Sequence, residues 1–188
     1  MGLGPEECQT YRALAARVNY IAQDNPCIQY SAKEICQHMA NPAVEHFAKT
    51  KKLARFIVGV KSARLCYAWQ SEAEALHMKI YADSDWAGCT ETRKSTSGGL
   101  AQVGRHTLRA WTSTQTTVAT SSAEAEFYAM VEGASRGLGL RSMLGELGVV
   151  TGVVELHTDS SAAKSFASRR GLGKMRHVDI NFCGCNRR

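Results

Sequence analysis

The spacing of apolar residues changes part-way along this chain, and the change constrains the fold more than any other feature. From Tyr11 to Ala22, apolar side chains recur every three or four residues, which is the period of a helix. In the stretch that begins at Leu65 and includes Met78, apolar and polar residues alternate, which is the period of a strand. We therefore predict a helical segment over residues 1–70 and a strand-containing domain over residues 71–188.

Three helices are predicted within the first segment. Pro5 suits the first turn of a helix, and Asn25-Pro26 ends that helix, because proline cannot continue one. Asn41-Pro42 makes a good cap and first position for the third helix. We expect the third helix to bury four apolar side chains and to turn its charged residues to solvent. These four are Val44, Phe47, Ala48 and Phe56.

A basic run follows in and after this third helix. Its cations fall within sixteen residues and are Lys49, Lys51, Lys52, Arg55, Lys61 and Arg64. The whole chain has a formal net charge of +6 and a pI of about 9.0. Such a cluster attracts phosphates through Coulomb attraction and counterion release, so a polyanionic partner is indicated. Taken alone, the run is equally typical of a solvated helix face.

The second domain is predicted to mix strands and helices. Strands are indicated around Met78–Ala82, over 98–103 and over 108–112, and the last two are joined by a short polar turn. Ser121 to Glu124 has the form of a helix capping box, and helical spacing continues to Leu147, with a break expected near Gly137. A strand over 153–158 and a helix over 160–168 follow. This order predicts an α/β fold with helices packed on the sheet.

Three acidic residues stand where strands end or a helix begins. Asp83 ends the first long strand, Glu126 lies early in the long helix, and Asp159 ends a later strand. Carboxylates that meet at one edge of a sheet repel one another unless a hard cation such as Mg²⁺ or Mn²⁺ neutralises them. Two such ions about 4 Å apart support in-line attack of water on a phosphodiester. Taken singly, the aspartates are ordinary turn formers and the glutamate an ordinary capping residue.

Two of these residues have close rivals in the sequence. Asp85 follows Asp83 by two residues, which puts both on one face if the strand continues, so Asp85 would assist or cap. Glu124 precedes Glu126 by two residues, and on a helix that shift turns a side chain to roughly the opposite face. Only one of the two glutamates can therefore point toward the aspartates.

The composition excludes several classes of protein. No stretch of about 18 consecutive apolar residues exists, and Met1 to Gln9 does not form a basic, apolar leader, so we expect neither a membrane span nor a secretion signal. The seven cysteines are odd in number and show no paired C-x-x-C spacing, which favours reduced thiols in the cytoplasm or nucleus. Cys183 and Cys185 are too few to form a metal site alone.

Four segments resemble a known family in their order and spacing. They are Tyr81–Gly88, Arg93–Gly99, Ser121–Ala129 and His157–Ala162. Together they resemble the ribonuclease H of copia-type LTR retrotransposons, over about residues 76–180. Upstream, Tyr11–Gly59 resembles the helical thumb and connection region that follows the polymerase core of the same Pol polyproteins.

This resemblance implies a ribonuclease H-like mixed sheet with helices packed on it, preceded by a small helical segment. It implies hydrolysis of the RNA strand of RNA/DNA hybrids with two Mg²⁺ or Mn²⁺ ions. It also implies the polymerase core of the polyprotein as a partner, and no membrane. Asp83, Glu126 and Asp159 match the family's metal-binding and catalytic carboxylates, and Glu126 is preferred to Glu124 because Glu126 to Ala129 matches the family's helix better. Contacts with nucleic acid are expected from Lys49, Lys51, Lys52, Arg55, Arg93, Lys94 and Ser95.

The end of the chain departs from the family pattern. Lys174–Ile180 resembles a segment that begins a helix in the family. In the family, that helix is followed by a further strand and by a final helix with a fourth metal-binding Asp. The residues after Ile180 do not resemble that helix, so we expect a domain that lacks both elements and an enzyme impaired by the loss. Asp179 belongs to the earlier helix in the family and is not expected to replace the fourth carboxylate. His177 is expected to be structural or to contact substrate.

The sequence argues against two other activities of retroelement polyproteins. No two aspartates are adjacent, which excludes polymerisation by this chain alone. An integrase would need a Glu about 35 residues after Asp159, beyond Arg188, which disfavours that function. A non-catalytic nucleic-acid-binding remnant and a structural fragment without a partner are the alternatives to the ribonuclease.

Overall fold

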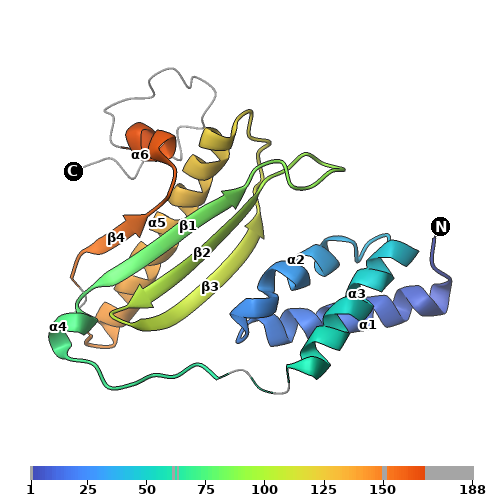
Figure 1. Cartoon of the computed structure of the whole chain (residues 1–188), viewed down its shortest axis with the longest axis horizontal. Helices are drawn as coiled ribbons and strands as arrows, with labels where there is room; N and C mark the ends of the chain where they lie inside the picture. The colour runs from blue at the N-terminus through green and yellow to red at the C-terminus, as the bar shows by residue number, and fades with distance from the viewer. Residues whose placement is uncertain (1, 61, 63, 150–151, 168–188) are drawn as a thin grey trace. The chain divides into compact units, whose positions relative to one another are not determined.

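The computed structural model describes residues 2–60, 62, 64–149 and 152–167 (Figure 1). It divides into two compact units, Met1–Cys66 and Tyr67–Arg188, whereas the sequence prediction put the boundary at residue 70. Each unit is described by itself. The segment 168–188 lies outside the described residues, as do Lys61 and the predictions made for His177, Asp179, Cys183 and Cys185.

The first unit consists of helices α1 (Pro5–Ala22), η1 (Pro26–Ile28), α2 (Gln29–Gln37) and α3 (Val44–Gly59). Pro5 begins α1, and the Asn25 side chain accepts a hydrogen bond from the Cys27 N–H at the start of η1, as expected for these residue types. The buried core contains Tyr11, Ala15, Val18, Ala22, Ile28, Ala32, Ile35 and Leu53. The Tyr11 hydroxyl, although buried, donates to the Ile35 carbonyl oxygen at 2.7 Å.

Helix α3 buries a different face from the one predicted. Val44 is 52% exposed, Phe56 is 47% exposed and Ala48 is also exposed, so only Phe47 of the expected set packs against the core. The buried residues of α3 are His46, Thr50 and Leu53. The prediction for Val44, Ala48 and Phe56 is therefore wrong.

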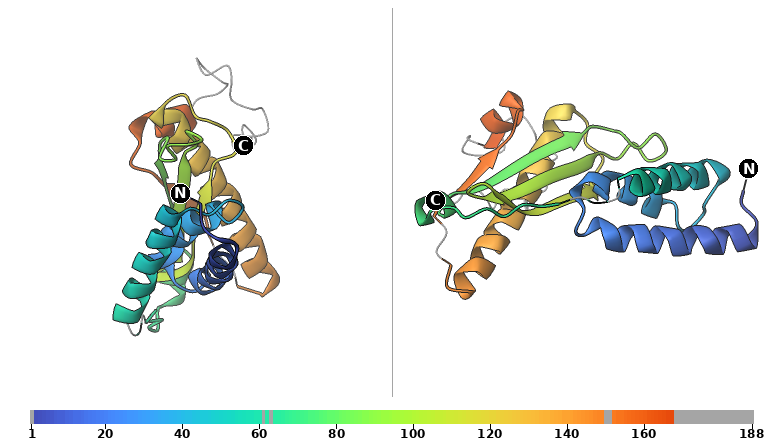
Figure 2. Two further views of the ribbon diagram at one scale, coloured as in Figure 1. Left: turned by 90° about the vertical axis from the view of Figure 1, so that its right-hand side faces the viewer. Right: turned by 60° about the horizontal axis from the view of Figure 1, so that its bottom comes forward.

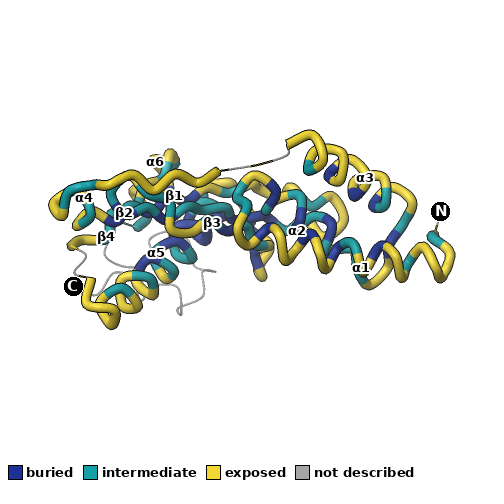
Figure 3. The backbone as a smooth tube through the Cα atoms, turned by 90° about the horizontal axis from the view of Figure 1, so that it is seen from below, coloured by how far each residue is buried: buried dark blue, intermediate teal, exposed yellow. Residues whose placement is uncertain are grey.

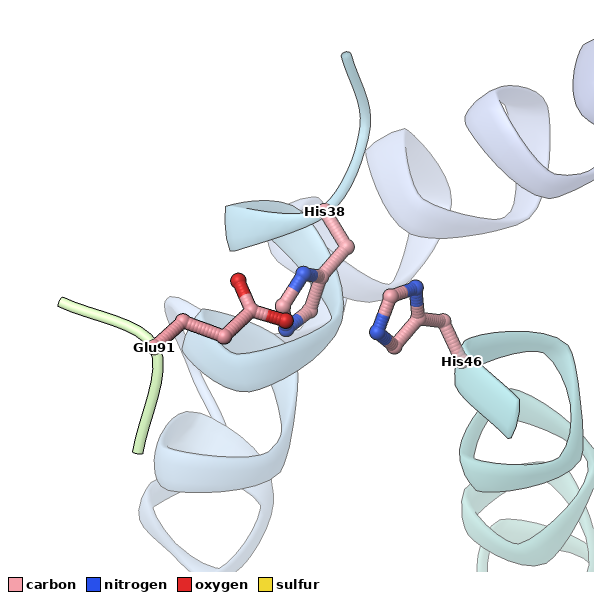
Figure 4. A group of neighbouring side chains, drawn as sticks. All are labelled: His38, His46 and Glu91. Carbon is pink, nitrogen blue, oxygen red and sulfur yellow. The ribbon is translucent and has the colours of Figure 1, made fainter. Parts of the chain in front are cut away.

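His46 gives the physical reason for this rotation of α3. Its Nδ1 accepts a hydrogen bond from the Ala43 N–H at 3.0 Å, which satisfies a backbone donor at the start of the helix. Its ring stacks on the ring of His38, with centroids 3.7 Å apart (Figure 4). These two contacts bury the polar side chain of His46, which the spacing of apolar residues alone would place on the exposed face of α3. Glu91, also drawn in Figure 4, belongs to the second unit.

The second unit contains a four-stranded mixed sheet in the order β3-β2-β1-β4. Its strands are β1 (Met78–Asp85), β2 (Thr96–Val103), β3 (His106–Thr114) and β4 (Val154–His157). β1 pairs antiparallel with β2 and parallel with β4, and β2 pairs antiparallel with β3. The helices are α4 (Glu72–Ala75), α5 (Ser122–Glu146) and α6 (Ser161–Ala167). The mixed α/β class is thus confirmed, but residues 65–69 form no strand.

Helix α5 runs along one face of this sheet (Figures 1 and 2). Met78, Ile80 and Ala82 alternate with more exposed residues of β1 and are buried on the side of α5. The buried residues of α5 lie in its first part, and its last turns are exposed (Figure 3). The core of the unit lies between the sheet and α5, and contains Met78, Ile80, Ala101, Val103 and Trp111, with Leu140 and Leu144 of α5 packed against them.

Two glycines allow α5 to approach the sheet closely. A Cβ at Gly133 would lie 3.2 Å from the Ala82 Cβ, and one at Gly137 would lie 2.8 Å from the Ile80 Cγ1. The predicted break near Gly137 is wrong, because α5 is continuous from Ser122 to Glu146. Packing against β1 explains the glycine there. None of the helices in the described part of the chain is long and apolar enough to cross a membrane.

Candidate metal centre

Three carboxylates from three separate elements meet at one end of the sheet. Asp83 lies near the end of β1, Glu126 in the first turns of α5, and Asp159 two residues after the end of β4. One oxygen from each lies within 4.8 Å of the others. β1 and β4 are parallel with Tyr81 opposite His157, so Asp83 and Asp159 each lie two residues beyond this register pair, at the same level of the sheet. The fold thus brings together the three residues singled out in the sequence.

Glu126 is the least exposed member of this acidic cluster. Its Oε1 accepts a hydrogen bond from the Ser84 hydroxyl at 2.8 Å, whereas its Oε2 is buried without a hydrogen-bond partner among the described residues. Burial raises the pKa of Glu126, and the nearby charges of Asp83 and Asp159 raise it further, although the bond from Ser84 opposes them. A buried carboxylate oxygen without a donor is costly unless a cation neutralises it.

Glu124 occupies a different environment. It is 1% exposed, and its carboxylate accepts hydrogen bonds from the Thr120 N–H, the Thr120 hydroxyl and the Tyr128 hydroxyl at 2.7–2.8 Å. Its own N–H donates to the Ser121 hydroxyl, which caps α5. Glu124 thus holds the start of the helix in place, and Glu126 is the glutamate that reaches the aspartates.

Asp85 is also outside the acidic cluster among the described residues. Its carboxylate occupies the space above Gly88, where any side chain would collide with it. The turn between these residues includes Ala87, whose φ of 53° is left-handed. Asp85 therefore packs on the turn that follows β1, which matches the capping role considered in the sequence.

A groove borders the two aspartates on the face of the sheet away from α5. It has a volume of about 540 Å³ and is lined by Tyr81, Ala82, Asp83, Gly98, Gly99, Leu100, His157, Thr158 and Asp159. Gly98 lies opposite Asp83 in the β1–β2 register, and a side chain there would meet no atom within 4 Å. The groove therefore opens onto the two aspartates of the acidic cluster.

Several known proteins that resemble this chain come from plant transposons. The chain is similar to retrovirus-related Pol polyproteins of plant transposons. It is 26% identical over 174 residues to that of transposon RE1 and 28% identical over 139 residues to that of RE2, both from Arabidopsis thaliana. It is 26% identical over 158 residues to that of TNT 1-94 from Nicotiana tabacum. These matches cover 92%, 74% and 84% of the chain and support a retroelement origin.

The matched segment is a small part of each transposon polyprotein. It covers 12% of the RE1, 9% of the RE2 and 12% of the TNT 1-94 polyprotein, so the chain spans about a tenth of their length. No protein-family model matches the chain. No solved structure matches it significantly.

The predicted phosphate contacts around residue 94 divide into exposed and buried ones. Arg93 is exposed and has a left-handed φ of 57°, in a loop closed by the bond from its N–H to the Cys89 carbonyl oxygen at 2.8 Å. Lys94 is half-buried. Ser95 is fully buried, and its hydroxyl oxygen accepts a hydrogen bond from the Ala87 N–H at 3.0 Å. The prediction that Ser95 contacts nucleic acid does not fit this burial.

The predicted cations of α3 all lie on the surface of the first unit. Lys49, Lys51, Lys52 and Arg55 are exposed. The Lys51 Nζ lies 4.9 Å from the centre of the Phe47 ring, a distance typical of a cation–π contact. These four exposed residues form the basic face of α3.

Sequence reasoning assigned no role to three residues of the site. Ser84 bonds Glu126, while Tyr81 and His157 line the groove. The role of Ser84 could have been predicted from strand alternation. Ser84 lies between Asp83 and Asp85, so its side chain points to the opposite face of β1, toward the helix. For Tyr81 and His157 the signal is their identical position, two residues before the aspartate on each strand.

Proposed function

We propose that the second unit is a ribonuclease H domain that hydrolyses the RNA strand of RNA/DNA hybrids. The observation that supports this most directly is the meeting of Asp83, Glu126 and Asp159 within 4.8 Å at the end of the sheet. The four segments that resemble copia-type ribonuclease H include these residues, and three of the relatives are Pol polyproteins of plant transposons. The order β3-β2-β1-β4 under a single long helix is compatible with a ribonuclease H-like sheet.

The residues present fit a divalent cation of the Mg²⁺ or Mn²⁺ kind. All three groups offer carboxylate oxygens, which these hard ions prefer, and the unpartnered Oε2 of Glu126 needs a positive neighbour. Asp83, Glu126 and Asp159 would hold one or two ions. The metal would lower the pKa of a bound water and stabilise charge on the leaving oxygen.

The protein's own groups would hold and orient this centre. Ser84 donates to Oε1 of Glu126, which fixes the glutamate between the two aspartates. Packing of α5 at Gly133 and Gly137 sets the distance from Glu126 to β1. The groove above Gly98 would accept the strand that is cut.

We infer that the cations bind the phosphate backbone. The basic face of α3 and the exposed Arg93 would supply most contacts, with Lys94 partly accessible. Such contacts read charge and shape rather than base sequence. The polymerase core of a Pol polyprotein would be the natural partner of the first unit.

The decisive experiment is hydrolysis of a hybrid by the full chain in Mg²⁺. An RNA strand labelled at one end and annealed to DNA should be cut, whereas the same RNA unpaired, or duplex DNA, should not. Asp83→Asn should abolish cutting, and Asp85→Asn is the matched control because its carboxylate packs on the turn.

Two outcomes would overturn the proposal. Cutting that persists in Asp83→Asn or in excess chelator would separate the activity from the acidic cluster. Tight hybrid binding without cutting, at every Mg²⁺ and Mn²⁺ concentration, would instead favour the non-catalytic nucleic-acid-binding remnant.

A further inference from the structure

Two aromatic rings form a pair on the open face of the sheet beside the acidic cluster. Tyr81 of β1 and His157 of β4 are register partners, and their rings stack with centroids 5.0 Å apart and planes inclined by 23°. Tyr81 is 40% exposed and the His157 side chain is 43% exposed. Stacked aromatic pairs usually bury most of their ring surface. In this pair, by contrast, both rings leave apolar surface exposed to solvent.

The position of this pair ties it to the candidate metal centre. Asp83 and Asp159 each follow their ring by two residues, so the pair lies one step back along the same strands, about 7 Å from the aspartates. Tyr81, His157, Asp83 and Asp159 all line the same groove. A single nucleotide with its phosphate at the carboxylates would therefore reach the rings.

The groove has free space on the side of Tyr81 that His157 does not cover. In the strand order, β4 lies on one side of β1 and β2 on the other. On the β2 side, Gly98 offers no side chain, and a Cβ built there would meet no atom within 4 Å. Leu100 lies opposite Tyr81 in the register and lines the same groove, so a flat ring would lie above Gly98, diagonally next to Tyr81 and beside the Leu100 side chain.

The carboxylate of Glu155, two residues earlier on β4, lies close to the His157 ring. Its Nε2 lies 3.4 Å from one oxygen of Glu155, and the other oxygen lies 3.4 Å from Nδ1 of His77. Hydrogen bonds from these two histidines lower the pKa of Glu155, so it is ionised at neutral pH. The interaction with Glu155 therefore orients the His157 imidazole, which stacks on the Tyr81 ring.

We propose that Tyr81 and His157 form a nucleoside subsite, in which the Tyr81 ring stacks on the base of an unpaired nucleotide next to the phosphate at the acidic cluster. The subsite rests on the proposed function for the identity of that phosphate. Aromatic side chains on a sheet bind unpaired bases in this way, with little preference for sequence. A base inside a duplex is already stacked, so the subsite selects an unpaired nucleotide at the end of a hybrid.

The test compares adenosine monophosphate with ribose 5-phosphate, which lacks the base. Both are titrated into the full chain with Mg²⁺ while NMR follows the ring C–H signals of His157 and His106. The nucleotide should shift the His157 signals and bind about 5- to 150-fold more tightly than the sugar phosphate, the range expected for one base–aromatic stack. Tyr81→Ala should remove this difference, and Tyr81→Phe should keep it.

The chain contains a matched control pair. Tyr67 and His106 also place a tyrosine beside a histidine, with centroids 5.3 Å apart, but away from the acidic cluster. Tyr67→Ala should leave both affinities unchanged. If Tyr81→Ala fails to fold, His157→Leu provides the second variant and should weaken nucleotide binding alone, with both affinities then measured by calorimetry because this variant lacks the His157 signals.

The outcomes separate this subsite from the proposed function. Equal affinity for the two probes, or equal shifts at His106 and His157, would overturn the subsite even if Asp83→Asn abolishes hybrid cutting. Binding of the nucleotide through Tyr81 in a chain that cuts no hybrid would overturn the proposed function and leave the subsite standing.

Discussion

The cations of α3 stand on one helix, whereas the carboxylates of the candidate metal centre come from β1, α5 and the segment after β4. On α3, each charge is exposed and can be solvated where it lies. In the acidic cluster, like charges are forced together, and burial and neighbouring aspartates raise the pKa of Glu126. The acidic cluster therefore depends on the packing of the fold and, under the proposed function, on a bound cation, whereas the basic face depends on neither.

The largest expected difference between the two regions is in catalysis. Asp159→Asn keeps the shape of the side chain but removes a charge that would hold the cation. The rate of hybrid cutting should fall at least about 100-fold, because loss even of a group that only supports a metal ligand costs 10- to 100-fold. Lys51→Gln should change the rate by only a few-fold at low salt. Comparable losses in both variants would break the distinction between the regions.

The packing beneath the acidic cluster provides the next test. Gly137→Val places a branched side chain where a Cβ alone would lie 2.8 Å from Ile80, so the free energy of unfolding should fall by about 1–3 kcal/mol. Gly139→Val on the same helix is the matched control, because a Cβ there meets no atom within 4 Å and the change should stay within about 0.5 kcal/mol. Chemical denaturation measures both. Equal effects would show that α5 does not depend on this close approach.

The charge of Glu126 should make stability depend on pH and on divalent cations. Its pKa is raised in the folded chain, so the folded state holds the proton more tightly than the unfolded state. The resulting stabilisation is present below the ordinary glutamate pKa and is lost as the pH rises through the raised value. Glu126→Gln should therefore raise the melting temperature at pH 7 but not at pH 4, and Mg²⁺ should stabilise the wild type more than the variant. A variant less stable than wild type at pH 7 would contradict this assignment.

The basic face should show the smallest effects on stability. Lys49→Gln, Lys52→Gln and Arg55→Gln should each change the free energy of unfolding by no more than about 0.5 kcal/mol. In hybrid binding, each should reduce the slope of log affinity against log salt by about one, if that residue contacts a phosphate. Unchanged slopes in all three would mean that nucleic acid does not lie on this face.

Local sequence determined much of this molecule. Helical spacing, Pro5 and Asn25-Pro26 predicted the first unit's helices, since these signals act within a few residues. Alternation around Met78 and the Ser121 cap predicted β1 and the start of α5 for the same reason. These predicted strands and helices were enough to suggest that Asp83 and Asp159 would lie together at one edge of a sheet.

Only the tertiary structure decided which side chains face one another. It supplied the physical basis for preferring Glu126 to Glu124, because Thr120 and Tyr128 take up the carboxylate of Glu124. It buried Ser95 under the turn at Ala87 and kept α5 straight through Gly137, where Ile80 occupies the space that a side chain would need. Each of these outcomes depends on contacts between segments that are far apart in the chain. The spacing of apolar residues shows which residues of one helix or strand share a face, but not which other segment that face contacts.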